Sequence, residues 1–478
     1  MMVELDAFAH LAPRSGREGG AKAGRAGGCD TIHSMHQDLK TAVGDDFPHL
    51  TSVLADLVRI ASVSADGFDP AEVRRSAETV AELLEGEGGQ DVQLLELDGA
   101  HPAVFAQIPG PPGTPTVLLY AHHDVQPPGP VDEWQTGPFE PFESDGRLYG
   151  RGASDDKSGI VMHLGAIRAF GGKPPVGIKV FVEGEEEIGS RHLPQFLDRY
   201  TELLTADVIV IGDAGNWRVG VPALTTSLRG ITAVEVEVRT LAAAQHSGLF
   251  GGLYPDALIV LSRLIASLHH DDGTVAVEGL VSQEVTGLEM AEEQAAAMAG
   301  VVPGLQTLGS GSLVSRLWTR PAISVLAVDA PPVAEAINQL VPAAKAKISM
   351  RTAPGQDNRA AVEALTAHLH ANVPWGAQIT VRGTDWGDGF ALSTEGEAFE
   401  AWKEGMRQAW GTEPVEMGVG GSIPFVPAFS EKLPGAPILL TGAGDPTSSV
   451  HAPNESQDLD DLEKSVLAEA IALRLLAG

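Results

Sequence analysis

Four short apolar runs constrain the fold most strongly, because each is typical of a buried strand and each is followed by acidic or histidine residues. The runs are 116–120, 178–182, 208–211 and 438–440. A helical repeat of apolar residues over 159–170 separates the first run from the second. Strands that alternate with helices in this way predict an α/β fold around a central, mostly parallel sheet.

A different pattern occupies the middle of the chain. Strands with one solvent-exposed face are predicted at 231–238 and 345–351, with another strand at 378–382 and helices at 257–268 and 360–371. This set is typical of a small α+β domain inserted into a larger one. We therefore predict a disordered tail over 1–45, a catalytic domain over 46–221 and 385–478, and an inserted lid or dimerisation domain over 222–384.

Composition argues against several classes of function. A chain of 478 residues is long for one ordinary core, which fits two folded domains. The formal net charge of −32 argues against binding nucleic acid, because phosphates need basic partners. No apolar span approaches about 20 residues, so a membrane-spanning helix is not expected. Cys29 is the single cysteine, which excludes an intrachain disulfide and favours a reducing, cytoplasmic location.

The acidic and histidine residues that follow the predicted strands indicate a metal site. Ligands of open α/β sheets gather at the carboxyl ends of the strands, so these side chains should converge. Converging carboxylates repel one another unless cations lie between them. Imidazole combined with carboxylate favours zinc or manganese over calcium or magnesium, and the HExxH pattern of helix-borne zinc sites is absent.

Five motifs, taken in order, resemble those of a known family. Residues 122–127 are HHDVQP, 145–152 are DGRLYGRG, 155–157 are DDK, 183–190 are EGEEEIGS and 420–424 are GGSIP. Together they resemble the M20 metallopeptidases, in the dipeptidase and carnosinase branch. The resemblance extends over nearly the whole chain after the predicted tail. It implies two divalent metal ions, zinc in the first place, with manganese or cobalt as alternatives.

The resemblance also implies a role for each matching residue. Five residues would hold the metal ions: His122 and Asp213 on one, Glu187 and His451 on the other, and Asp155 bridging both. Glu186 would be the general base that activates a metal-bridged water. Asp124 would lie behind His122 and fix the tautomer of its ring.

The resemblance extends to substrate-binding residues in the later half of the chain. His246, in the sequence QHSGLFGG, is similar to a histidine that stabilises the oxyanion and comes from the neighbouring subunit in dimeric members. The three residues before His246 are Ala-Ala-Gln, where the family often has Arg-Asp-Leu. The hydrogen bonds that this segment makes around His246 are therefore not predicted by the resemblance. Arg351 matches the arginine that binds the substrate carboxylate. Gly421 and Ser422 are expected to contact substrate, and a homodimer through the lid domain is expected.

Other polar residues have simpler interpretations. His123 should point away from the site, because successive residues of a strand face opposite ways. Asp156 is placed to cap the following helix, and His163 is expected in the core. Four histidines of the middle segment are expected to be solvated: His269, His270, His368 and His370.

These features predict a dipeptidase that cleaves dipeptides or short peptides with a free C-terminal carboxylate. The alternative is an N-acyl-amino-acid deacylase of the acetylornithine or succinyl-diaminopimelate kind. The DDK and EGEEEIGS motifs favour the dipeptidase, because the deacylases more often have Asp-Met-Lys in place of DDK. A binding protein without catalysis is disfavoured, because every expected metal ligand and the expected base are present.

Overall fold

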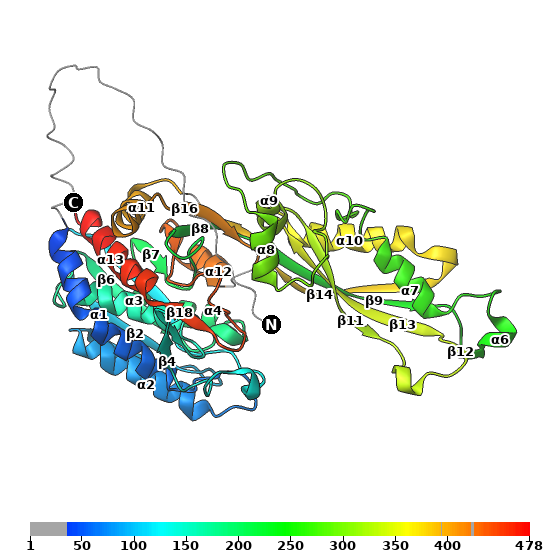
Figure 1. Cartoon of the computed structure of the whole chain (residues 1–478), viewed down its shortest axis with the longest axis horizontal. Coiled ribbons are helices and arrows are strands. Elements are labelled where there is room, and N and C mark those ends of the chain that lie inside the picture. The colour runs from blue at the N-terminus through cyan, green and yellow to red at the C-terminus, as the bar shows by residue number, and fades with distance from the viewer. Residues whose placement is uncertain (1–35, 393, 422–424) are drawn as a thin grey trace, which may run out of the picture. The chain divides into compact units, whose positions relative to one another are not determined.

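A nine-stranded mixed sheet forms the larger part of the fold (Figure 1). The computed structural model describes residues 36–392, 394–421 and 425–478. The strands run in the order β1-β2-β6-β3-β7-β17-β8-β15, and β16 pairs with β8. Their bounds are β1 Gln90–Leu95, β2 Ala103–Ile108, β3 Thr116–His122, β6 Gly177–Glu183, β7 Val208–Ile211, β8 Ala223–Leu228, β15 Phe390–Ala391, β16 Val415–Val419 and β17 Ile438–Leu440. The four neighbours β6, β3, β7 and β17 are parallel, so their carboxyl ends meet at one edge.

Helices cover both faces of this sheet. Successive residues of each central strand therefore pack into two different apolar clusters, one on each face. In β3, Val117, Leu119 and Ala121 belong to the cluster formed with α1, α2, α3, α11 and α13. Leu118 and Tyr120 belong to the cluster formed with α4 and α12. The bounds are α1 Gln37–Val58, α2 Pro70–Gly86, α3 Lys157–Arg168, α4 Leu193–Arg199, α11 Glu397–Trp410, α12 Phe425–Lys432 and α13 Leu459–Leu476. Burial on both faces explains why these strands are uninterrupted apolar runs.

The middle of the chain forms a four-stranded antiparallel sheet in the order β11-β13-β9-β14. Its strands are β9 Gly230–Arg239, β11 Ala322–Asp329, β13 Ala343–Thr352 and β14 Gln378–Gly387, and its helices are α7 Ala257–Ala266 and α10 Asn358–Asn372. Val236 and Ile348 pack against the two helices. Glu235 and Lys345, whose side chains lie on the opposite face of the same strands, form an ion pair of 2.6 Å. One face is therefore apolar and the other is charged, as the alternating sequence predicts.

Shorter elements complete the fold. Strands β4 Phe142–Ser144, β5 Arg147–Tyr149 and β18 Ser456–Asp458 form a small sheet, and β10 Gln245–His246 pairs with β12 Gln339–Leu340. The short helices are α5 Thr201–Leu204, α6 Ser247–Phe250, α8 Glu292–Ala299 and α9 Leu313–Trp318, with 3-10 turns at Val131–Glu133, Glu186–Ile188, Val333–Glu335 and Pro374–Gly376. Among the described residues, no helix is both long and apolar enough to cross a bilayer.

The structure confirms the predicted α/β class and its four central strands. These strands could be predicted because each is a continuous apolar run. Residues 37–45 were expected in the tail but lie in α1, since Leu39 and Val43 extend its buried stripe. Residues 1–35 lie outside the described part of the chain. Strand β8 pairs within the nine-stranded sheet, although it begins just after the domain boundary predicted at residue 222. The division into a catalytic domain and an inserted domain stays a prediction.

Candidate metal centre

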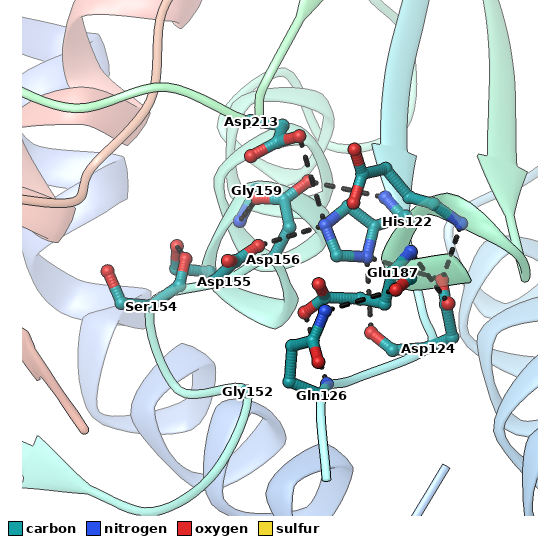
Figure 2. Close-up of polar contacts among 12 residues, drawn as sticks. His122, Asp124, Gln126, Gly152, Ser154, Asp155, Asp156, Gly159, Glu187 and Asp213 are labelled. Carbon is teal, nitrogen blue, oxygen red and sulfur yellow. Dashed lines mark hydrogen bonds and ion pairs between the residues drawn. The ribbon is translucent and has the colours of Figure 1, made fainter. Parts of the chain in front are cut away.

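His122 lies at the centre of an acidic cluster at the carboxyl end of β3 (Figure 2). Its side chain is fully buried, and its Nε2 atom lies 3.0 Å from Oδ1 of Asp155 and 3.9 Å from Oδ2 of Asp213. Asp213 follows β7, the strand beside β3, and Asp155 lies in the loop before α3. Three segments far apart in the sequence therefore converge where the parallel strands end, as predicted.

Asp155 links two histidines through its two carboxylate oxygens. Oδ1 contacts Nε2 of His122 and Oδ2 contacts Nε2 of His451, each at 3.0 Å. His451 also lies 3.1 Å from Oε2 of Glu187. His451 has a φ of 64°, a left-handed conformation that non-glycine residues seldom adopt and that is frequent at functional sites. One carboxylate thus stands between two groups of nitrogen and oxygen donors.

Asp124 supports the cluster from behind. Its Oδ1 lies 3.4 Å from Nδ1 of His122, and its backbone oxygen lies 3.1 Å from the same nitrogen. Its two carboxylate oxygens also accept the backbone N–H groups of Glu186 and Glu187, at 3.2 and 3.1 Å. The hydroxyl of Ser64 donates to it at 2.6 Å. Asp124 therefore orients the His122 ring and also holds the turn that follows β6.

Burial and mutual repulsion raise the pKa of most carboxyl groups in the cluster. Burial, followed by the charges of Glu187 and Asp155, raises the pKa of Glu186 to about 8 although His122 opposes the shift. Burial and the charge of Asp155 raise the pKa of Asp213 well above its ordinary value. Asp155 and Asp124 are exceptions. Burial opposes the shift, but hydrogen bonds from His122 and His451 lower the pKa of Asp155, and those from His122 and Ser64 lower the pKa of Asp124.

The two histidines show the complementary shift. Hydrogen bonds to Asp155 and Glu187 raise the pKa of His451 to about 10. Burial lowers the pKa of His122, but hydrogen bonds to Asp124 and Asp155 raise it well above its ordinary value. In the metal-free protein the two imidazole rings thus keep their protons, which lie between ring nitrogen and carboxylate oxygen. Such protons leave when a cation binds. The mixed nitrogen and oxygen donors fit zinc, manganese or cobalt, so the cluster fits two divalent ions that share Asp155.

Asp156 also lies near the His122 ring, among the expected ligands. His122, Asp156 and Asp213 offer donor atoms within 4.8 Å of one another, as do His122, Asp155 and Glu187. Both oxygens of Asp156 are occupied, however, since one accepts from the backbone N–H of Gly159 and the other from that of His122. The predicted capping role of Asp156 is therefore confirmed, and Asp155 is the better candidate ligand.

The remaining histidines agree in part with their predictions. His123 is buried and contacts the backbone oxygen of Pro102 at 2.9 Å, away from the cluster. His163 is buried in the core as predicted, against Glu469. His370 is exposed, whereas His368 is half-buried and contacts the backbone oxygen of Ser267 at 2.9 Å. The expectation that His368 is solvated is therefore wrong, because helix α10 turns it toward the segment after α7.

A pocket of about 530 Å³ opens beside the acidic cluster. Its polar lining includes Asp155, Glu186, Asp213 and His451. Its apolar lining comes mainly from large side chains: Trp217, Met290, Met298, Leu317, Trp318, Met417 and Val419. The two tryptophan rings pack edge to face with centroids 5.7 Å apart. The candidate site therefore joins a polar centre to a large apolar surface.

The predicted carboxylate-binding residue, Arg351, is half-buried near the end of β13, and burial lowers its pKa. The neighbouring Arg229 donates to the backbone oxygens of Leu317 and Arg320 at 2.9 and 2.7 Å. Burial, and after it the charge of Arg351, lowers the pKa of Arg229 to about 10. Because Leu317 lines the pocket, this pair of arginines brings positive charge close to the pocket wall. Gly421 follows β16, and Ser422 lies outside the described residues.

His246 is not among the residues that line the pocket. It is exposed in β10, where its Nδ1 accepts the backbone N–H of Gly248 at 3.0 Å. This contact places the ring proton of neutral His246 on Nε2, which leaves a donor directed away from its own backbone. The fold of one chain therefore does not bring His246 to the acidic cluster.

Sequence reasoning missed several buried groups that hold the cluster in place. Glu455 is fully buried and contacts the backbone of the loop that contains Asp155. Lys157 is also buried, and its ammonium donates to the backbone oxygens of Leu57 and Ile60 at 2.7 and 2.8 Å. Their side-chain type alone suggests surface residues. The only signal in the sequence was their nearness to His451 and to Asp155.

Comparisons with known proteins support the geometry. The model of peptidase family M20/M25/M40 matches residues 118–474, a range that includes every predicted metal ligand. A cysteinylglycine-S-conjugate dipeptidase of Corynebacterium striatum is 37% identical over 363 residues, covering 74% of this chain and 80% of the relative. A Cys-Gly metallodipeptidase of Saccharomyces cerevisiae is 27% identical over 452 residues, covering 87% and 92%. The structure of human carnosine dipeptidase 1 has a TM-score of 0.75 at 25% identity, covering 93% of this chain and 99% of that one.

Proposed function

The chain belongs to peptidase family M20/M25/M40, and on this premise we propose that it is a dipeptidase that works with two divalent metal ions, zinc in the first place. The substrate is a dipeptide or short peptide with a free C-terminal carboxylate. The dipeptidases among its relatives support this substrate class over N-acyl amino acids. The observation that most supports the two-metal site is the position of Asp155, whose two oxygens face His122 and His451.

The proposed ligand sets follow from this position. His122 and Asp213 hold one ion, Glu187 and His451 hold the other, and Asp155 is shared. When bound, such ions polarise a scissile carbonyl and favour deprotonation of a water molecule. Glu186 lines the pocket beside this centre. We assign it the role of general base: its carboxylate would accept a proton from the attacking water and return it to the leaving amine.

Positive charge beside the pocket suits the substrate carboxylate. We assign this carboxylate to Arg351, whose guanidinium can bind it through two parallel hydrogen bonds. Arg229 stands next to Arg351 and donates to two backbone oxygens, so we assign it the part of holding the pocket wall. Binding of the carboxylate fixes the distance from the C-terminus to the scissile bond, which accounts for a preference for dipeptides.

A homodimer formed through the inserted segment would supply His246. Exposed apolar side chains gather there on α6, on β11 at the edge of its sheet, and on the segment between β11 and β12. On and just after α6 they are Leu249, Phe250, Leu253 and Tyr254, and from β11 onward they are Val325, Leu326, Val328, Val333 and Ile337. Val333 is 95% exposed and Leu253 is 74% exposed, and exposed apolar side chains gathered on one surface are typical of a site that binds a partner. A symmetric pairing of this surface would bury it and place the His246 of one subunit near the other.

A substrate panel tests the proposed activity. After removal of metal with a chelator, we expect no turnover, and we expect zinc, manganese or cobalt to restore hydrolysis of dipeptides. N-acetylated and N-succinylated amino acids should be turned over far more slowly, because they lack the second residue. The released amino acids are measured by chromatography. Turnover of the acyl substrates alone would refute the dipeptidase assignment and support the deacylase.

The apolar lining of the pocket predicts which dipeptides are preferred. A side chain that fills the surface formed by Trp217, Trp318 and Met298 should raise kcat/KM, since each methylene buried in such a pocket is worth about tenfold or more. We expect Met-Gly and Leu-Gly to exceed Gly-Gly, and Met298→Asp to remove most of this preference. Val302→Asp is the matched control, because Val302 is exposed nearby but does not line the pocket. Equal kcat/KM for all these dipeptides would exclude the pocket from substrate binding.

A further inference from the structure

Glu455 occupies an unusual position for a carboxylate, because it is fully buried and surrounded by hydrogen-bond donors from a single loop. Its Oε1 accepts the backbone N–H groups of Ser154 and Asp155, each at 3.0 Å. Its Oε2 accepts the backbone N–H of Gly152 at 3.0 Å and the guanidinium of Arg151 at 2.6 Å. Each oxygen therefore serves two donors, and three of the four are backbone groups between Gly152 and Asp155.

The same contacts join two loops that each supply a proposed ligand. The backbone oxygen of Glu455 accepts the N–H of Gly150 at 2.9 Å, and the guanidinium of Arg151 also reaches the backbone oxygen of Ala452 at 3.4 Å. Arg151 is 1% exposed, so this ion pair is shielded from water. The loop that contains Asp155 is thus bound to the segment that begins with His451.

We propose that Glu455 is a positioning residue that holds Asp155 and His451 at the separation needed by the metal site that they share with Glu187. It does not touch the metal or the substrate in this arrangement; it acts through the backbone of the ligand loop. The inference rests on the proposed two-metal function and adds to it a determinant of metal affinity. Partners behind metal ligands commonly change affinity by about 10–100-fold when replaced.

Glutamine is the sharpest replacement at this position. Glu455→Gln keeps the size of the side chain, but its NH₂ group can accept no hydrogen bond. Whichever way the amide is oriented, two of the four donors then face another donor. We expect the Asp155 loop to loosen, so the second equivalent of metal binds about 10–100-fold more weakly than in the wild type. The first equivalent, bound by His122 and Asp213 as well, should be less affected.

The experiment uses Co²⁺ as the probe, because its visible absorbance reports the geometry of each site. Metal-free wild type and Glu455→Gln are titrated with Co²⁺, and kcat and KM for a dipeptide are measured at low and saturating Co²⁺. We expect the variant to need more metal for its second absorbance step, and kcat to recover at saturating Co²⁺ while KM stays near the wild-type value. Glu455→Asp, which retains the charge and shortens the side chain, should give an intermediate shift.

Glu469→Gln is the matched control. Glu469 is as buried as Glu455, and its carboxylate on α13 accepts from Nδ1 of His163 on α3, so it contacts none of the loops that carry the proposed ligands. This variant should lower Tm without changing Co²⁺ affinity. If Glu455→Gln lowers Tm in the same way and binds both equivalents as tightly as the wild type, the positioning role is refuted. If the wild type itself binds fewer than two equivalents, the two-metal proposal fails instead.

Hydrogen exchange of the wild type supplies a test that needs no folded variant. The N–H groups of Gly152, Ser154 and Asp155 should be protected in the metal-free protein, because Glu455 holds them before metal arrives. Mass spectrometry of the peptide covering 150–156 measures this protection. Full and rapid exchange of that peptide in the metal-free protein, next to a protected α3, would overturn the inference.

Discussion

Replacing Glu186 with glutamine should lower kcat by about 10²–10⁴-fold, the usual contribution of a general base, while leaving metal content unchanged. Glutamine has the same size but cannot accept a proton at neutral pH. The side chain of Glu186 lines the pocket beside the acidic cluster, and its backbone N–H is held by Asp124. The turn should therefore keep its shape. Metal is measured by elemental analysis of the dialysed protein, and kcat by release of amino acids.

Two matched variants separate the base from its neighbours. Glu187→Gln should lose metal as well as activity, because the Glu187 carboxylate faces His451 at 3.1 Å. Glu202→Gln, on the exposed surface of α5, should change neither. If Glu186→Gln lost metal to the same extent as Glu187→Gln, Glu186 would be a ligand and another group would have to accept the proton. Unchanged turnover would remove it from the reaction.

The central part of this fold could be predicted because it depends on local apolar pattern. Strands β3, β6, β7 and β17 are buried on both faces, so their sequences are continuous apolar runs. Once they were predicted to be parallel, the convergence of His122, Asp213 and His451 followed from topology. Strands β1 and β2 were not predicted. Strand β1 is mostly exposed and its sequence alternates weakly, whereas β2 is a short buried run that a periodicity argument does not distinguish from a segment of buried helix.

Groups that act through long-range contacts could not be predicted. Glu455 lies about 300 residues along the chain from the loop that it holds, and its sequence neighbourhood resembles any surface loop. The capping role of Asp156 could be predicted, because an N-cap acts on residues two or three positions away. Roles carried over from the resemblance, such as those of His246 and Arg351, depend on how subunits and segments meet, which no local pattern encodes.

The second large effect concerns His246, which should matter only when it comes from another subunit. His246→Ala is expected to lower kcat by about 10²–10³-fold, as the loss of one oxyanion donor does. The exposed ring is free of the acidic cluster in its own chain, and its Nε2 proton is available as a donor. His370→Ala is the matched control, because His370 is an exposed histidine on α10 and should be dispensable. Steady-state hydrolysis of a dipeptide measures both.

Mixing two inactive variants decides whether His246 acts within or between subunits. A dimer of one Glu186→Gln chain and one His246→Ala chain has one site with an intact base, and the partner of that site has an intact His246. Random exchange of subunits makes about half of the dimers mixed, and one of the two sites in each mixed dimer is active. The activity should therefore return to about a quarter of the wild-type value. If His246 acts within its own chain, each site of the mixed dimer lacks one group and activity stays near zero. A preparation that remains monomeric and fully active would exclude the dimer altogether, because no second chain would then be needed to complete the site.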